Sequence, residues 1–346
     1  MRDRHGGPLA QLTLWRVREI FREPEALFWV FAFPVLLSIA LGIAFRSRAP
    51  QALQVAVQDG PGAAALVAAL DSAQGLRAEA LDSVQAHEQL RTGRVALVVI
   101  PGTPIVFRFD STRDESHLAR LRAMNAIEAA SGRRDVVAIT DVKVTEKGSR
   151  YIDFLIPGLI GLNIMGTGMW GLGFGTVRMR TKNLLKRLLS SPMRKSHFLA
   201  AQIFARLVFL PLEVGAVLLF GVIVFGIPVR GSLISLAIIA LLGAMSFAGL
   251  GLLTASRAKT IEGVSGLMNV VMVPMWILSG VFFSWSHFPD AIQPLIRALP
   301  LTALNDALRA NLLDGASLAS TVGLLAIVAA WGVVSFGVAL KIFRWK

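Results

Sequence analysis

Glu213 is the acidic residue that lies deep inside an apolar stretch of this sequence, at 207–229. A carboxylate is costly to place in a bilayer, so an acid there indicates either a charged partner or a part in transport. Possible partners are Arg206, seven residues earlier, and the amides of Asn163 and Asn269 in other apolar stretches. The sequence leaves open both interpretations, structural pairing and a transport or proton-carrying role.

The other residue types that could serve as catalysts or metal ligands form no recognisable site in the sequence. The chain has no cysteine and five scattered histidines, none in a metal-ligand spacing. The phosphate-binding pattern G-x-x-x-x-G-K-[ST] is absent from the sequence. We therefore predict no catalytic residue, no metal site and no cofactor bound by this chain, and we expect that it is not itself an enzyme.

The elements that must hold Glu213 are long apolar runs. Only 16% of the 346 residues are charged, against roughly 25% in a soluble domain. A helix needs about 20 apolar residues to cross a bilayer. Six stretches qualify as transmembrane helices, the first read as an uncleaved anchor: 26–45, 152–177, 207–229, 231–256, 263–286 and 315–340. The predicted fold class is an α-helical integral membrane protein.

The positions of lysine and arginine predict the orientation of these spans. With both termini in the cytoplasm, the inside segments carry 18 basic residues and the short outside loops carry three. This bias follows the positive-inside rule and indicates a multi-pass protein of the bacterial cytoplasmic (inner) membrane. The net charge of +13 is then a sign of topology, and we expect membrane lipid and no nucleic acid among the partners.

Residues 46–151 form a long hydrophilic insertion, which we expect to be a small extracytoplasmic α/β domain. Its 14 basic and 12 acidic residues nearly balance, so it can cross the membrane despite its arginines. Apolar runs bounded by turn residues predict its elements. We expect strands at 53–57, 95–100, 105–109 and 136–144, and helices at 63–70, 84–90 and 115–130.

Three further segments lie outside the spans: a cytoplasmic amphipathic helix within 1–25, a basic cytoplasmic loop at 178–206, and short interfacial or re-entrant helices at 287–314. A short tail at 341–346 ends the chain inside. In the loop, leucines gather on one helical face and basic residues on the other. That pattern fits a helix on lipid phosphates or a docking helix for a cytoplasmic partner, and both remain open.

Two other patterns also allow two interpretations. The second span is rich in glycine, which favours either close static packing or a flexible helix that lines a path. Trp170, Trp276 and Trp285 either mark the membrane interface or contact a substrate.

Four segments in order resemble ABC-2 type permeases: Tyr151–Gly161, Lys186–Leu199, Pro274–Phe283 and Leu299–Arg309. In that family they correspond to the start of the second span, the cytoplasmic coupling segment, the fifth span and the external re-entrant helices. The insertion also resembles the extracytoplasmic domain that larger members carry between spans one and two.

The resemblance implies the membrane subunit of an ATP-driven exporter for a drug, lipid or glycoconjugate. Its partners would be ABC ATPase subunits, which use ATP and Mg, and a second permease copy or sister permease. A periplasmic adaptor is a further partner that the resemblance allows. The coupling residues would be Lys182, Leu185, Lys186, Arg187, Leu189, Ser191, Pro192, Arg194 and Lys195. The pathway residues would be Asn163, Met165, Trp170, Glu213, Asn269, Met272 and Trp276.

Alternatives from other classes are a secondary transporter that works without ATP, and a membrane receptor or enzyme that uses the external domain. A secondary transporter usually shows internal repeats, and none is evident in this sequence.

Overall fold

The computed structural model describes residues 13–14, 17–18, 21–45, 52–133, 148, 150–181, 195–258 and 260–342, with only the helical backbone over 195–203. The chain divides into two compact units. One contains Met1–Arg46 with Thr145–Lys346, and the other is Ser47–Val144. The described chain is mostly helical with one small sheet, and each unit is considered by itself.

Two helices of the larger unit contain π-helical segments. The first runs through α2 (Pro24–Leu27), η1 (Phe28–Ala32) and α3 (Phe33–Ala44). The second runs through α7 (Tyr151–Gly168), η2 (Met169–Phe174) and α8 (Gly175–Thr181). Such π-helical turns are rare in α-helices as a whole. Those that do occur are often found at functional sites.

The remaining long helices are α10 (Lys195–Phe225), α11 (Leu233–Ala255), α12 (Ile261–Leu278) and α15 (Val322–Ile342). Five described helices are long and apolar enough to span a membrane: Tyr151–Thr181, Phe204–Phe225, Leu233–Ala255, Ile261–Leu278 and Val322–Ile342. The apolar part of the first helix, Phe28–Ala44, is shorter. Six spans and cytoplasmic termini therefore stay a prediction.

Helix ends differ from the predicted spans where the backbone turns. Helix α10 ends at Phe225, before the expected end at 229, because Gly226 has a φ of +62° and Pro228 follows. Helix α12 ends at Leu278 instead of reaching 286, and Gly280 has a φ of +68°. Helix α15 begins at Val322 instead of 315. Apolar composition alone cannot locate these turns.

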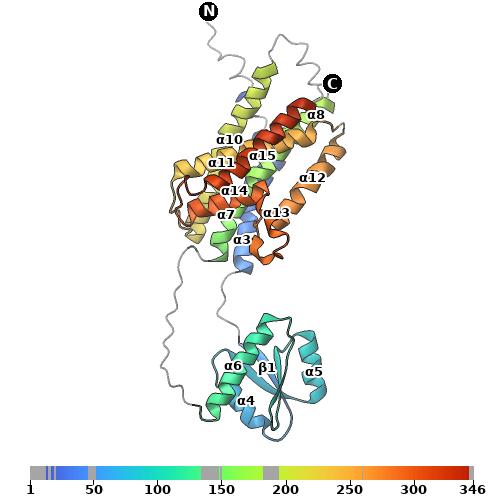
Figure 1. The fold of residues 1–346 in the computed structure, drawn as a ribbon, viewed down its shortest axis with the longest axis vertical. Coiled ribbons are helices and arrows are strands. Elements are labelled where there is room, and N and C mark those ends of the chain that lie inside the picture. The colour runs from blue at the N-terminus through green and yellow to red at the C-terminus, as the bar shows by residue number, and fades with distance from the viewer. Residues whose placement is uncertain are drawn as a thin grey trace, which may run out of the picture. The chain divides into compact units, whose positions relative to one another are not determined.

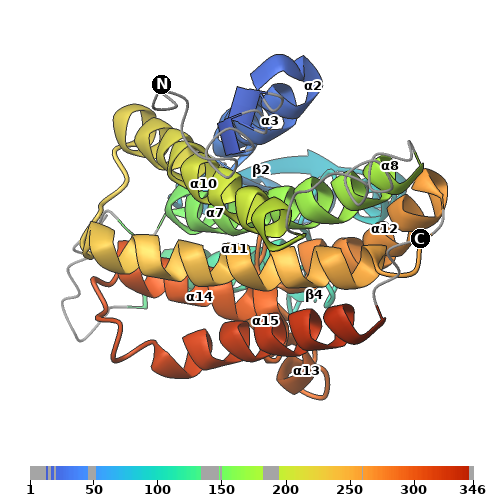
Figure 2. The same cartoon turned by 90° about the horizontal axis from the view of Figure 1, so that it is seen from above.

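Helices α7 and α11 lie at the centre of the larger unit. Helix α11 packs against both α7 and α15, and Figure 2 shows it between them. At Gly168 of α7 an added Cβ would lie 2.8 Å from the Cβ of Phe247, and at Gly251 of α11 it would lie 2.8 Å from the Cα of Met169. Small residues thus let the two backbones approach closely, which supports the static-packing interpretation at these positions.

The segment after α12 folds back onto the bundle (Figure 1) as η3 (Trp285–His287), α13 (Gln293–Arg297) and α14 (Pro300–Leu312). Helix α14 packs against α7, α11 and α15. Most of its residues are buried, including the polar side chains of Thr302, Asn305 and Asn311. It is a core element of this unit.

The smaller unit is a three-layer α/β fold. Its elements are β1 (Leu53–Gln58), α4 (Ala63–Asp71), β2 (Leu76–Leu81), α5 (Ser83–Thr92), β3 (Leu97–Ile100), β4 (Val106–Arg108) and α6 (Asp114–Ala130). The sheet order is β2-β1-β3-β4, with β1 parallel to β2 and β3, and β4 antiparallel. Helices α4 and α6 cover one face of the sheet and α5 covers the other (Figure 1).

Most of these elements lie where the sequence predicts them, with one exception. Strand β2 was not predicted because it is an edge strand whose Arg77 and Glu79 are exposed, which leaves no continuous apolar run. The strand predicted at 136–144 lies outside the described residues.

Candidate functional site

Glu213 is almost completely buried, with 1% of its surface exposed. Arg206 donates to both carboxylate oxygens, from Nη1 at 2.8 Å and from Nη2 at 2.6 Å. Seven residues are about two helical turns, so both side chains project from one face of α10. We call Arg206 and Glu213 the α10 pair. Its bidentate geometry is the strongest form of ion pair.

The α10 pair lies beside a polar part of α7. Thr167 lies beside Glu213, and its hydroxyl donates to the Asn163 carbonyl at 2.8 Å. The Asn163 amide donates to the carbonyl of Val30 at 2.9 Å. Val30 belongs to the π-segment η1. These contacts link three helices of the larger unit through buried polar groups.

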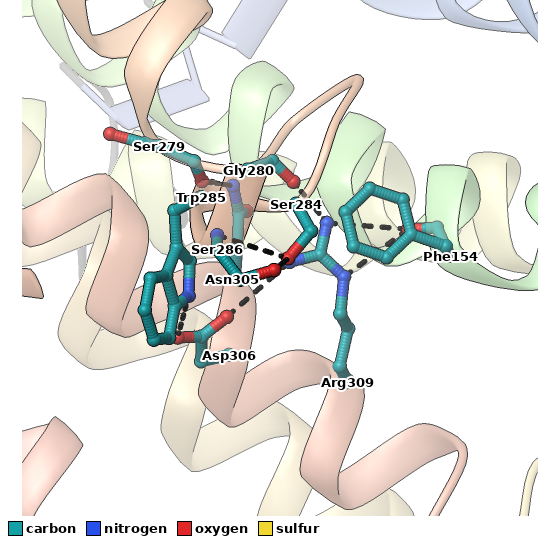
Figure 3. A network of polar contacts seen from close by, with 9 residues as sticks. All are labelled: Phe154, Ser279, Gly280, Ser284, Trp285, Ser286, Asn305, Asp306 and Arg309. Atoms are coloured by element: carbon teal, nitrogen blue, oxygen red, sulfur yellow. Dashed lines mark hydrogen bonds and ion pairs between the residues drawn. The ribbon is translucent and has the colours of Figure 1, made fainter. Parts of the chain in front are cut away.

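A second polar group gathers around Arg309 of α14, as Figure 3 shows. Its guanidinium donates to the carbonyl of Phe154 in α7, at 3.3 Å from both Nε and Nη2, and to the carbonyl of Gly280 after α12. It also lies 3.7 Å from the centre of the Phe154 ring, a cation–π contact. One side chain of α14 thus contacts both α7 and the turn after α12.

Asp306, one turn before Arg309, completes this group. Its carboxylate accepts from Arg309 at 3.4 Å and from the Trp285 indole at 3.0 Å. The guanidinium carbon of Arg297 lies over the Trp285 ring, 4.3 Å from its centre. Burial raises the pKa of Asp306 and lowers the pKa of Arg309 to about 10, and each charge opposes the shift of the other. We call Phe154, Gly280, Trp285, Asp306 and Arg309 the α14 cluster.

The predicted pathway residues are distributed over several surroundings. Met165 and Met272 are buried in the core, and Trp170 and Trp276 are half-buried against it. Asn163 and Glu213 share Thr167 as a neighbour. Asn269, considered as a partner for Glu213, is exposed on α12 instead. The part of these residues in transport stays a prediction.

The predicted coupling residues mostly lie outside the described residues: Lys182, Leu185, Lys186, Arg187, Leu189, Ser191, Pro192 and Arg194. Lys195 is the first residue of α10, and its side chain is not described. Before this segment, Arg178 pairs with Glu23 at 2.8 Å. Arg180 donates to the carbonyls of Ala255 and Ala258 at 3.1 and 2.7 Å. Both contacts tie α8 to neighbouring segments.

Sequence reasoning did not single out Arg309 or Asp306 as site residues, and it considered Trp285 only as an interface marker or a substrate contact. The signal was present, because opposite charges three residues apart in a semi-apolar helix can pair on one face. Their connection to α7 depends on contacts between residues 155 positions apart, as from Arg309 to Phe154. Only the tertiary structure provides that information.

Comparison with known proteins adds to this geometry. Residues 24–341 match the family described as ABC-2 family transporter protein. The inner membrane transport permease YadH of Escherichia coli K12 is 25% identical over 206 residues, which cover 56% of this chain and 78% of that relative. ABC transporter G family member 20 of Dictyostelium discoideum is 22% identical over 183 residues, 53% of this chain and 25% of that protein. The apolar helices and these matches indicate a multi-pass protein of the cytoplasmic membrane.

Proposed function

Since this chain belongs to the ABC-2 transporter family, we propose that it is the permease subunit of an ATP-driven exporter whose ATPase is a separate polypeptide. The observation that carries the proposal is the family match, which extends over 24–341. The chain has no G-x-x-x-x-G-K-[ST] pattern, so a partner would supply ATP hydrolysis.

We propose that the basic segment 182–194, with Lys195, receives the motion of that ATPase. It lies between α8 and α10 in the chain, and both helices are anchored by buried or half-buried arginines. A displacement of the segment would therefore reach α7 through α8 and would reach the α10 pair through α10. Asn163, Met165, Trp170, Glu213, Asn269, Met272 and Trp276 remain the proposed pathway residues.

We also propose that the permease works as a pair, either with a second copy or with a sister permease. Helix α12 supports this proposal because one side of it is apolar and uncovered in the single chain. Val270 is 70% exposed and Ile277 is 57% exposed. Such a surface fits contact with lipid, with a partner helix or with an amphipathic substrate. The proposed topology has six spans and both termini in the cytoplasm.

The decisive experiment is affinity purification of the protein in mild detergent, followed by mass spectrometry of co-purifying proteins. We expect a stoichiometric soluble ATPase with a phosphate-binding loop. Its absence from folded, monodisperse protein would contradict the ATP-driven mechanism. Export of fluorescent amphipathic dyes from vesicles then tests the substrate class.

A charge-reversed variant tests the docking segment. Lys186→Glu combined with Arg187→Glu should abolish co-purification, because the ATPase would meet two acids in place of two bases. Arg77→Glu, on the exposed edge strand of the α/β unit, is the matched control and should retain the ATPase. Equal recovery from both variants would remove these two residues from the docking site.

A further inference from the structure

Arg309 lies at one end of the bundle, where it connects α7 with the segment between α12 and α14. Its side chain is 12% exposed and its donors go to carbonyls of α7 and of the turn after α12. Gly280 lies beyond the last residue of α12, where helix carbonyls lack intrahelical donors. Arg309 therefore supplies donors that the backbone of this turn does not provide.

The fit of the turn against α7 depends on a glycine. At Gly158 an added Cβ would lie 2.6 Å from the Val281 carbonyl oxygen and 3.1 Å from Nη2 of Arg309. The first turns of α7 thus lie directly against the turn after α12, and the guanidinium lies beside this contact. Separation of α7 from α12 at this end would require these bonds to break.

The contacts of Arg309 with α7 and with Asp306 are long. Its contact with Asp306 is 3.4 Å and its two bonds to Phe154 are 3.3 Å, longer than usual for charged groups, whereas its bond to the Gly280 carbonyl is short. Two neighbouring polar atoms, Ser279 Oγ and Asn305 Oδ1, are buried without a hydrogen-bond partner among the described residues. Unpaired buried polar atoms favour any arrangement that brings them water.

We propose that Arg309 is a releasable latch, a positioning residue that holds the turn 279–286 and α14 against the first turns of α7 and lets go when a substrate leaves. The inference rests on the proposed function, in which this end faces outside and α7 and α12 border the path. When the latch is closed, Ser279 and Asn305 are sealed from water. When it is open, both meet solvent.

The absence of cysteine from the chain permits a direct test. Ser279→Cys places a thiol at a position that is 0% exposed, where the native hydroxyl makes no described hydrogen bond. Ser286→Cys, in the same turn, is the control because Ser286 is exposed. A membrane-impermeant maleimide is applied to right-side-out membrane vesicles that contain the protein with its natural partners.

We expect slow labelling at residue 279 and fast labelling at residue 286 in the resting protein. Arg309→Met should raise the labelling rate at residue 279 about tenfold, which corresponds to about 1.4 kcal/mol in the opening equilibrium, and should leave residue 286 unchanged. An unchanged rate at residue 279 would overturn the latch. If Arg309→Met does not fold, the labelling test is repeated with Asp306→Asn. This variant retains the guanidinium of Arg309 and removes the charge of its carboxylate partner.

ATP separates the latch from the proposed function. Turnover with ATP enclosed in the vesicles, on the cytoplasmic side where the ATPase would lie, should accelerate labelling at residue 279 in the protein with native Arg309. Acceleration by Arg309→Met without any effect of ATP would contradict the ATP-driven cycle and leave the positioning role of Arg309 intact. Acceleration by ATP alone would overturn the latch and leave the exporter proposal intact.

Discussion

Two arginine–carboxylate pairs in the described part of the larger unit differ in where the arginine directs its donors. In the α10 pair, Arg206 gives both terminal nitrogens to Glu213 at 2.6 and 2.8 Å, and its contact outside α10 is a long one, 3.4 Å from Nη2 to the Ile164 carbonyl of α7. In the α14 cluster, Arg309 has one 3.4 Å contact to Asp306 and directs its other bonds to backbone carbonyls of α7 and of the turn after α12.

This difference separates two uses of a buried charge. In the α10 pair the two charges neutralise each other, which mainly allows a charged residue to remain in an apolar helix. In the α14 cluster the guanidinium of Arg309 joins segments that are distant in sequence, which mainly fixes the positions of these segments relative to one another. The two pairs thus differ in how many of the arginine's hydrogen bonds go to other segments of the bundle.

Removal of one partner from the α10 pair should produce the largest effect. Glu213→Leu leaves Arg206 buried and unpaired, at a cost of about 3–5 kcal/mol in the free energy of unfolding. Thermal unfolding in detergent, followed by tryptophan fluorescence, measures it. Glu213→Leu combined with Arg206→Met should regain most of that loss, because no charge remains. Export by this double variant at the native rate would show that the pair has no part in transport.

An added methyl group between α7 and α14 should cost less. At Gly161 a Cβ would lie 1.9 Å from Oδ1 of Asn305, and overpacking of this kind costs about 1–3 kcal/mol. Gly166→Ala is the matched control on the same helix, since nothing lies within 4 Å of its Cβ position. We expect Gly161→Ala to lower the unfolding temperature and Gly166→Ala to leave it near the native value. Equal effects would mean that α14 does not rest on α7 here.

Loss of one hydrogen bond in the α14 cluster should have a smaller effect. Trp285→Phe removes the indole donor from Asp306, and a bond to a charged group contributes about 1.5 kcal/mol at the lower end of its range. Trp276→Phe is the control because its indole nitrogen is buried without a described hydrogen-bond partner. Chemical denaturation should find Trp285→Phe less stable than Trp276→Phe. The opposite order would contradict the assigned bond.

The exposed ion pair between Arg178 and Glu23 should contribute least. Both side chains are 43% exposed, and pairs of this kind contribute about 0–1 kcal/mol. Arg178→Ala should therefore leave the unfolding temperature almost unchanged at physiological salt. A loss as large as that of Glu213→Leu would show that this contact is covered by another chain in the assembled protein.

Much of the fold could be predicted from the pattern of residue types. Long apolar runs predicted the long helices because a bilayer and a packed bundle both require them. The helix predicted at 84–90 is also present, as α5, and Gly93 with a φ of +74° ends it. The end of α10 follows from the local residues Gly226 and Pro228, but the edge strand β2 and the early end of α12 could not be predicted. The limits of β2 and α12 depend on sheet pairing and on a turn whose partners lie far away in sequence.

The candidate site divides in the same way. The sequence by itself placed Arg206 on the same helical face as Glu213, as one of three possible partners, because that relation is local to one helix. The role of Arg309 was decided only by the tertiary structure. Its partners, the carbonyls of Phe154 and Gly280, are backbone atoms that every residue type carries, so no side-chain pattern can identify them before the helices are packed.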